Sequence, residues 1–211
     1  MRTIPLQLNH LRAVSLFVAK QDIRYYLNGV LVEVTPTAVR LCATNGHAMA
    51  VTNTPHAEGE PAPICGQWII PTDAIKAGIK CAGKHLSVVM LSVPEDGTSN
   101  NCTLGLPGNA VMFNAIDGRF PDYRRVVPVA CSGELAQYDP EYLFLFKQAA
   151  LVYRGKHAKV SINICHNGKE SARIGGIDDE FIGVIMPWVV GDAPALPDWW
   201  TNTAPALAVA A

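Results

Sequence analysis

The hydrophobic pattern of the first 55 residues predicts one helix among several strands. Apolar and polar residues alternate over Thr3–Leu8, which is typical of a half-buried strand. Over Asn9–Lys20 the apolar residues recur at approximately helical spacing, and Asn9 supplies the helix cap. Alternation returns in three further predicted strands, Tyr25–Val34, Ala38–Ala43 and Met49–Thr52. Asn45-Gly46 predicts a tight turn before the last of them.

The same order of elements begins again after His56–Pro63, a short linker rich in Pro, Glu and Gly. Trp68–Ile70 predicts a strand, and Pro71-Thr72 marks the start of a helix over Asp73–Gly83. The strands predicted after this helix are Leu86–Val93, Thr103–Leu106 and Ala110–Ala115. We therefore interpret residues 1–55 and 64–120 as two copies of one supersecondary unit, although their sequences barely match.

A third, partial copy follows the stretch DGRFPDYRRVVP at Asp117–Pro128. Phe120-Pro121 ends one apolar segment, because proline pushes the residue before it into an extended conformation. From Tyr123 we predict a strand that crosses from one globular unit to the next. Asp139-Pro140 then caps a helix, and residues 191–211, rich in Pro and Ala, predict a flexible tail. The strands predicted around this helix are Leu135–Tyr138, Lys159–Cys165, Ala172–Ile177 and Phe181–Met186.

Composition narrows the classes of function. The formal net charge is −1 and the pI is near 6.6, which argues against a protein that grips nucleic acid by bulk electrostatics, so any DNA contact must be local. The six cysteines form no CxxC pair and no signal peptide precedes them, which indicates reduced thiols in a cytoplasmic protein. No apolar run is long enough to span a membrane.

Two separate stretches carry a resemblance to a known family. DGRFPDYRRVVP resembles the segment that joins the second and third domains of the bacterial DNA polymerase III sliding clamp, its beta subunit. Upstream, QDIRYYLNG at Gln21–Gly29 and ATNGHAM at Ala43–Met49 resemble the family's QDxRYYLNG and ATDGHRL segments, in the same order and at similar spacing. The resemblance covers roughly residues 1–128, and the remaining third matches weakly, mainly through Ile185-Met186-Pro187.

The resemblance implies an α+β fold of the DNA-clamp type, with repeated strand-helix-strand half-units, antiparallel sheets outside and helices on one face. Residues 1–123 would form a complete clamp-like domain and 124–190 a partial one with a single half-unit, with the family's first domain missing. The implied function is that of a processivity factor, a non-catalytic accessory subunit without cofactors. It would hold DNA polymerase on double-stranded DNA without reading its sequence.

The resemblance also implies a peptide-binding pocket between domains. Its expected lining residues are Leu27, Thr44, Gly46, His47, Met49, Pro121, Arg125, Val126, Met186 and Pro187. An apolar groove with a few polar anchors suits a linear peptide that offers a leucine or phenylalanine plus a glutamine. DNA polymerase and other clamp-binding proteins would dock by such motifs. This sequence departs from the family at Asn45, which replaces an aspartate, and at Ala48, which replaces an arginine.

DNA contacts are expected from a loop and from helix faces. The family's DNA-touching loop maps onto Gln21, Arg24, Tyr25 and Tyr26. Basic residues on the predicted helices are the second group, namely Lys76, Lys80, Lys84 and Lys147. A modest local positive field holds phosphates loosely, which permits sliding.

Alternatives to an encircling clamp remain open. Half-units pair alternately within and across domains, so three of them cannot simply repeat head to tail into a ring. The chain could instead be a non-encircling clamp fragment, a peptide-binding adaptor or decoy, while the resemblance leaves open a clamp loader and a homo-oligomer. An enzyme ranks last, because His47 has no nucleophile spaced to serve it. The apolar LPDWW patch of the tail raises the hypothesis that the tail folds back into the groove.

Overall fold

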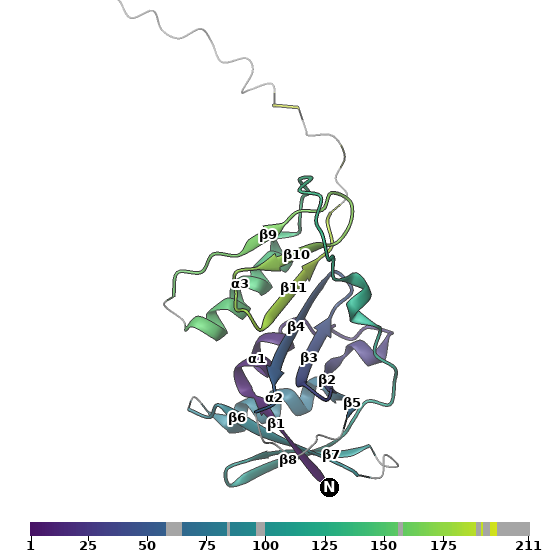
Figure 1. The fold of residues 1–211 in the computed structure, drawn as a ribbon, viewed down its shortest axis with the longest axis vertical. Helices are drawn as coiled ribbons and strands as arrows, with labels where there is room; N and C mark the ends of the chain where they lie inside the picture. Colours follow the sequence, from purple (N-terminus) through teal and green to yellow (C-terminus); the bar gives the residue numbers. More distant parts are fainter. Residues whose placement is uncertain are drawn as a thin grey trace, which may run out of the picture.

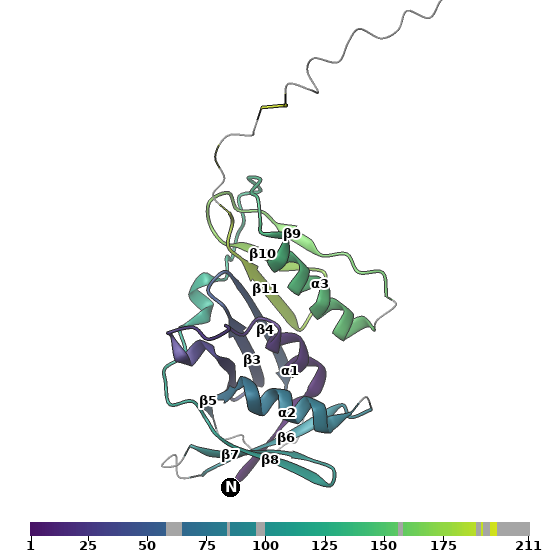
Figure 2. The same cartoon turned by 180° about the vertical axis from the view of Figure 1, so that it is seen from behind.

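Two antiparallel sheets form the framework of the protein, with the α-helices gathered on one side of them (Figures 1 and 2). The computed structural model describes residues 1–57, 65–83, 85–95, 100–155, 158–188, 191 and 195–197. Most of the predicted tail therefore lies outside the described residues, as does Lys84. No helix in the described part of the chain is long and apolar enough to cross a membrane.

The described elements fall into three units in chain order. The first unit contains β1 (Arg2–Gln7), α1 (Leu8–Ser15), the 3-10 helix η1 (Tyr25–Leu27), β2 (Gly29–Val34), β3 (Ala38–Thr44) and β4 (Ala48–Pro55). The second contains β5 (Gly66–Pro71), α2 (Thr72–Ala82), β6 (Val88–Val93), β7 (Asn101–Leu106) and β8 (Asn109–Asn114). The third contains α3 (Pro140–Arg154), β9 (Asn163–Cys165), β10 (Ala172–Gly175) and β11 (Phe181–Ile185).

The first two units exchange their leading strands. β1 pairs with β6 of the second unit, from Arg2 opposite Val93 to Gln7 opposite Val88, while β5 pairs with β2 of the first unit. One sheet therefore has the strand order β1-β6-β7-β8. Because each unit completes its sheet with a strand of the other, the two units form one folded body.

The third unit extends the other sheet. β11 pairs antiparallel with β4, from Phe181 opposite Thr52 to Ile185 opposite Ala48, which gives the seven-stranded order β5-β2-β3-β4-β11-β10-β9. On the helix side of this junction Phe17 and Phe146 pack with their ring centroids 4.8 Å apart, and both side chains are fully buried. A Cβ atom at Gly183 would lie 2.5 Å from Phe146 Cε1, so glycine is needed there to admit the ring.

A second core lies on the opposite face of the seven-stranded sheet. It contains apolar side chains of β2, β3, β4 and β11 and of the segment that joins the second and third units, among them Leu31, Met49, Phe120, Tyr123 and Val184. Every residue of β2 is buried, since helices cover one of its faces and this joining segment covers the other. The alternation predicted for this region is therefore absent from the burial pattern of β2.

The joining segment differs from the prediction, because Tyr123–Val126 forms the 3-10 helix η2 and not a strand. The Asp122 side chain accepts a hydrogen bond from the backbone N–H of Arg124, which caps the turn, and the ring of Tyr123 is buried. Three other predicted elements also differ from the structure. The first helix ends at Ser15 and not at Lys20, residues 25–27 are helical, and Leu135–Tyr138 is reduced to one bridge between Gln137 and Trp188.

Candidate peptide-binding site

A buried carboxylate fixes the joining segment to the sheet. Glu33 on β2 is 7% exposed, and its Oε2 accepts hydrogen bonds from the Tyr123 hydroxyl at 2.6 Å and from Arg124 Nη2 at 2.5 Å. Its Oε1 accepts from Gln67 Nε2 at 2.8 Å. The Arg124 guanidinium also lies over the Tyr123 ring, 4.6 Å from its centroid. A buried charge requires such partners, so Glu33 holds η2 at one place on the sheet.

Protonation of Glu33 should loosen this attachment. Burial raises the pKa of Glu33, but the hydrogen bonds from Tyr123, Gln67 and Arg124 outweigh it and leave the pKa below its ordinary value. A lowered pKa stabilises the fold above the pKa of the unfolded chain, and this contribution is lost as the pH falls through the folded value. We expect the wild type to lose more free energy of unfolding than Glu33→Gln between about pH 7 and pH 3.5, measured by urea denaturation. Equal losses in both proteins would show that Glu33 does not carry this pH dependence.

The turn between β3 and β4 forms one wall of a pocket beside this segment. The Asn45 side chain accepts hydrogen bonds from the N–H groups of His47 and Ala48, both at 2.9 Å. The Thr44 hydroxyl donates to Ala48 O at 3.0 Å and accepts from the N–H of Gly46, whose φ of 93° favours glycine. The Asn45 side chain therefore shapes the turn as a neutral acceptor, without a charge.

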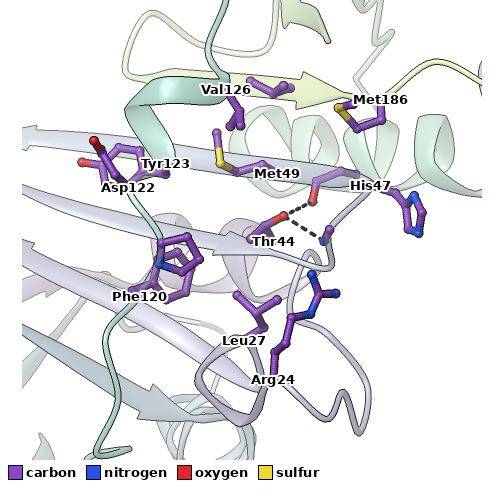
Figure 3. A pocket seen from close by; sticks show the side chains of 14 residues that line it. Arg24, Leu27, Thr44, His47, Met49, Phe120, Asp122, Tyr123, Val126 and Met186 are labelled. Atoms are coloured by element: carbon purple, nitrogen blue, oxygen red, sulfur yellow. Dashed lines mark hydrogen bonds between the residues drawn. The ribbon is translucent and has the colours of Figure 1, made fainter. Parts of the chain in front are cut away.

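The end of β11 reaches the same turn. The N–H of Met186 donates to His47 O at 2.8 Å, and the His47 ring stacks on Tyr142 of α3 with a centroid separation of 5.4 Å and an interplanar angle of 10°. Residues from the first and third units are thereby held together around one opening. Figure 3 shows the His47 ring directed away from the other labelled side chains, so its backbone does more for the pocket than its ring.

The pocket has a volume of about 230 Å³ and is mostly apolar in its lining (Figure 3). Eight of the ten expected residues line it, namely Leu27, Thr44, Gly46, His47, Met49, Pro121, Val126 and Met186. The other lining residues are Arg24, Ala48, Phe120, Asp122, Tyr123 and Val184. The strands supply the floor and the joining segment supplies one side.

Two of the expected residues do not line this pocket. Arg125 is exposed on η2, where Arg124 and not Arg125 turns inward to Glu33. Pro187 lies in a neighbouring hollow of about 550 Å³, which it shares with His47, Asp139, Tyr142, Met186 and Trp188. Since His47 and Met186 line both, the hollow is adjacent to the pocket and extends it toward α3.

Arg24 lines the pocket wall, although the resemblance predicts only a DNA contact for this residue. Its guanidinium binds the Asp22 carboxylate with Nη2 to Oδ2 at 2.7 Å, and this hydrogen bond lowers the pKa of Asp22 to about 2. A Cβ atom at Gly46 would lie 3.1 Å from Arg24 Nη2. Arg24 therefore brings a positive charge to this wall.

The expected DNA-contacting residues fall into separate regions. Lys76 and Lys80 are exposed on α2, whereas Tyr26 packs against the second core near Gly118. Gln21 and Tyr25 are exposed ahead of β2; Gln21 lies in a loop with a φ of 53°, and Tyr25 is the first residue of η1. Lys147 is exposed on α3 beside Phe144, at a shallow groove. Within the described ranges no group of three or more His, Cys, Asp or Glu side chains could hold a metal ion.

Comparison with known proteins assigns the family. The model of the DNA polymerase III beta subunit, central domain, matches residues 7–122, which is more than half of the chain. The chain belongs to the DNA polymerase III beta subunit family. The beta sliding clamp of Vibrio cholerae is 36% identical over 153 residues, and that of Escherichia coli K12 is 28% identical over 166 residues. These alignments cover 72% and 74% of this chain.

The chain corresponds to only part of these beta subunits. It spans 39% of the Vibrio cholerae protein and 41% of the Escherichia coli protein.

Solved structures extend the likeness in fold to 90% of the chain. The TM-score is 0.68 for the DNA polymerase III beta subunits of Pseudomonas aeruginosa (20% identity) and Thermotoga maritima (14% identity). The chain covers 67% and 66% of those structures. A further Pseudomonas aeruginosa sliding clamp, with a TM-score of 0.62 at 18% identity, has griselimycin bound. The predicted α+β clamp fold is confirmed.

Proposed function

We propose that this protein is a sliding-clamp-like processivity factor, a non-catalytic accessory subunit that holds DNA polymerase on double-stranded DNA in the cytoplasm. The observation that carries the proposal is the apolar pocket where β4 and β11 join, in a member of the beta subunit family. Polymerase and other partners would insert short peptide segments there. The occurrence of a griselimycin complex in a clamp of the same fold supports ligand binding by this class of protein.

The chemistry of the lining defines the peptide. Leu27, Met49, Val126 and Met186 offer an apolar floor that suits a leucine or phenylalanine side chain. Arg24 and Asp122 offer one charge of each sign at the wall. A neutral glutamine side chain, which both donates and accepts hydrogen bonds, fits such a wall better than a charged residue does. The proposed ligand is therefore a linear segment with a leucine or phenylalanine and a glutamine.

A polymerase assay tests the proposal as a whole. Primer extension on a long primed template should give longer products per binding event when the protein is present. An excess of free peptide with the leucine or phenylalanine and glutamine should shorten the products again, because it competes for the pocket. Product lengths that do not respond to the protein would contradict the proposed function.

Exposed lysines of α2 are proposed to face the phosphates. Replacing both Lys76 and Lys80 with glutamate should weaken DNA binding and reduce its salt dependence, since each lost phosphate contact lowers the slope of log K against log salt by about 0.9. Fluorescence anisotropy with duplex DNA over a series of salt concentrations measures both effects. The control is Lys159→Glu with Lys169→Glu, which changes the net charge equally on exposed residues of the third unit. An equal loss of DNA affinity in the two double variants would contradict the assignment of the phosphate contacts to α2.

A further inference from the structure

β8 is an uncovered strand at the edge of the four-stranded sheet, whereas the pocket lies on the seven-stranded sheet (Figure 1). Four strands of the described sheets have a neighbour on one side only, β1, β8, β5 and β9. β1 carries Pro5, which lacks an N–H, and β9 is three residues long. The edge of β5 is occupied where the N–H of Ile116 donates to Ile69 O at 2.9 Å. Each of these three edges therefore has a feature that blocks pairing with another chain.

β8 has none of these protections. Its sequence NAVMFN spans six residues without a charge or a proline, and Met112 is 84% exposed. Long, uncharged edge strands present a row of free N–H and C=O groups and pair readily with another strand. Val111 and Phe113 are partly buried against the helix side of the sheet. A strand added at β8 would cover them further.

The first unit shows how such an edge is completed in this fold. β4 is the last strand of the first unit as β8 is the last strand of the second, and β4 is paired antiparallel with β11. That pairing uses the outer edge of β11, whose other side is taken by β10. The strand that completes β8 must therefore come from outside the described part of this molecule.

The geometry points to β8 of a second copy of this chain as the partner, paired antiparallel about a twofold axis. Residues that face each other across two paired strands lie on the same side of the sheet, which leaves two central registers. In one, Val111 faces Val111 of the other copy and Met112 faces Ala110. In the other, Met112 faces Met112 and Val111 faces Phe113. Both registers satisfy a twofold axis that passes through a residue pair. The edge is thus complementary to itself, which is what an isologous contact requires.

The direction of the hydrogen bonds selects the register. Pro107-Gly108 forms the tight turn between β7 and β8, so Asn109 and Leu106 pair through the backbone N–H and C=O groups of both residues. These groups alternate in direction along a strand, so those of Val111 and Phe113 also point to β7. Those of Ala110, Met112 and Asn114 point to the free edge. The N–H of Ala110 is bonded to the Asn109 side chain at 2.8 Å, as expected for an outward donor. Centring the axis on Met112 pairs all three outward residues, and the N–H of Ala110 would exchange its bond to the Asn109 side chain for one to the other copy.

Sedimentation velocity on the full chain tests this inference. We expect the wild type to form dimers over concentrations from about 1 to 100 µM, and Met112→Lys to raise the dimer dissociation constant by at least about tenfold, because two lysines would face each other across the axis. Met90→Lys is the matched control, since Met90 is a half-exposed methionine of the same sheet on the interior strand β6. It should leave the dimer unchanged.

A second variant separates edge pairing from side-chain effects. Met112→Pro removes an N–H that points away from β7, so the hairpin should keep its own hydrogen bonds while the dimer is lost. Circular dichroism and peptide binding should remain at wild-type levels in both Met112 variants, because the pocket lies on the other sheet. A wild-type monomer at every concentration, or a dimer that persists in both variants, would overturn the inference.

Discussion

Replacing Met186 with glutamate is expected to weaken binding of a leucine- or phenylalanine- and glutamine-containing peptide by at least about tenfold, or about 1.4 kcal/mol. Met186 lines the pocket at the end of β11 and is 41% exposed, so a carboxylate can be accommodated without disrupting the core. In the complex that carboxylate would lose its water beside the apolar side chains of the pocket and the peptide, which is unfavourable. Isothermal titration calorimetry with the synthetic peptide measures the change.

Ile182 provides the matched control for Met186. It is 40% exposed on β11, and it lines a different hollow, on the far side of Tyr123. Ile182→Glu introduces the same charge near the same strand and should bind the peptide as the wild type does. If both variants bind normally, the peptide does not use this pocket, and if both lose binding, the effect comes from damage to β11.

Phe146→Ala should cause the largest loss of stability, about 3–5 kcal/mol in the free energy of unfolding. The ring is fully buried between α3, Phe17 and β11, where Gly183 leaves space for it, and alanine would leave a cavity at the contact between the first and third units. Because Met186 follows β11, loosening this contact should also weaken peptide binding. Urea denaturation and calorimetry on one sample measure the two effects.

Phe144 on the same helix is the control for Phe146. Its side chain is 53% exposed and lines the shallow groove with Val160 and Ile162 of the third unit, so Phe144→Ala should change the free energy of unfolding by less than about 0.5 kcal/mol. A similar loss in both variants would mean that the effect comes from helix α3 itself and not from its contact with Phe17.

Local signals in the sequence predicted many element boundaries well. Asp139-Pro140 begins α3, with the Asp139 carboxylate accepting from the N–H of Glu141 at 2.8 Å, and Asn45-Gly46 forms the turn before β4. The helix predicted over Asp73–Gly83 is observed as α2, Thr72–Ala82. These signals succeed because a cap or a tight turn is determined by neighbouring residues alone.

The failures have tertiary causes. Phe17 and Val18 continue the helical spacing after Ser15, yet they are buried in the core outside the helix. Tyr123–Val126 has the composition of a strand but forms η2, because Glu33, distant in sequence, holds Tyr123 and Arg124. The exchange of β1 and β5 between units has no local signature either, since antiparallel pairing is decided by packing.

The pocket was found through the resemblance and not through periodicity. Eight expected residues converge because η1, the turn before β4, the joining segment and the end of β11 meet at one place. The sequence does not predict Arg24 on the pocket wall, because its place there depends on its hydrogen bonds to Asp22, which position its guanidinium at Gly46. Phe120 and Val184 were missed, although an aromatic residue before Pro121 was a signal of a fixed apolar side chain.

Retention on circular DNA tests the clamp assignment most directly. The protein is incubated with a nicked circular duplex, together with whatever loading factor the polymerase system provides, and then separated by gel filtration in moderate salt. We expect the protein to stay with the circle and to be released when a single cut makes the DNA linear, because enclosure and not tight contact would hold it. Equal retention on circular and linear DNA, or none on either, would contradict its assignment as an encircling clamp.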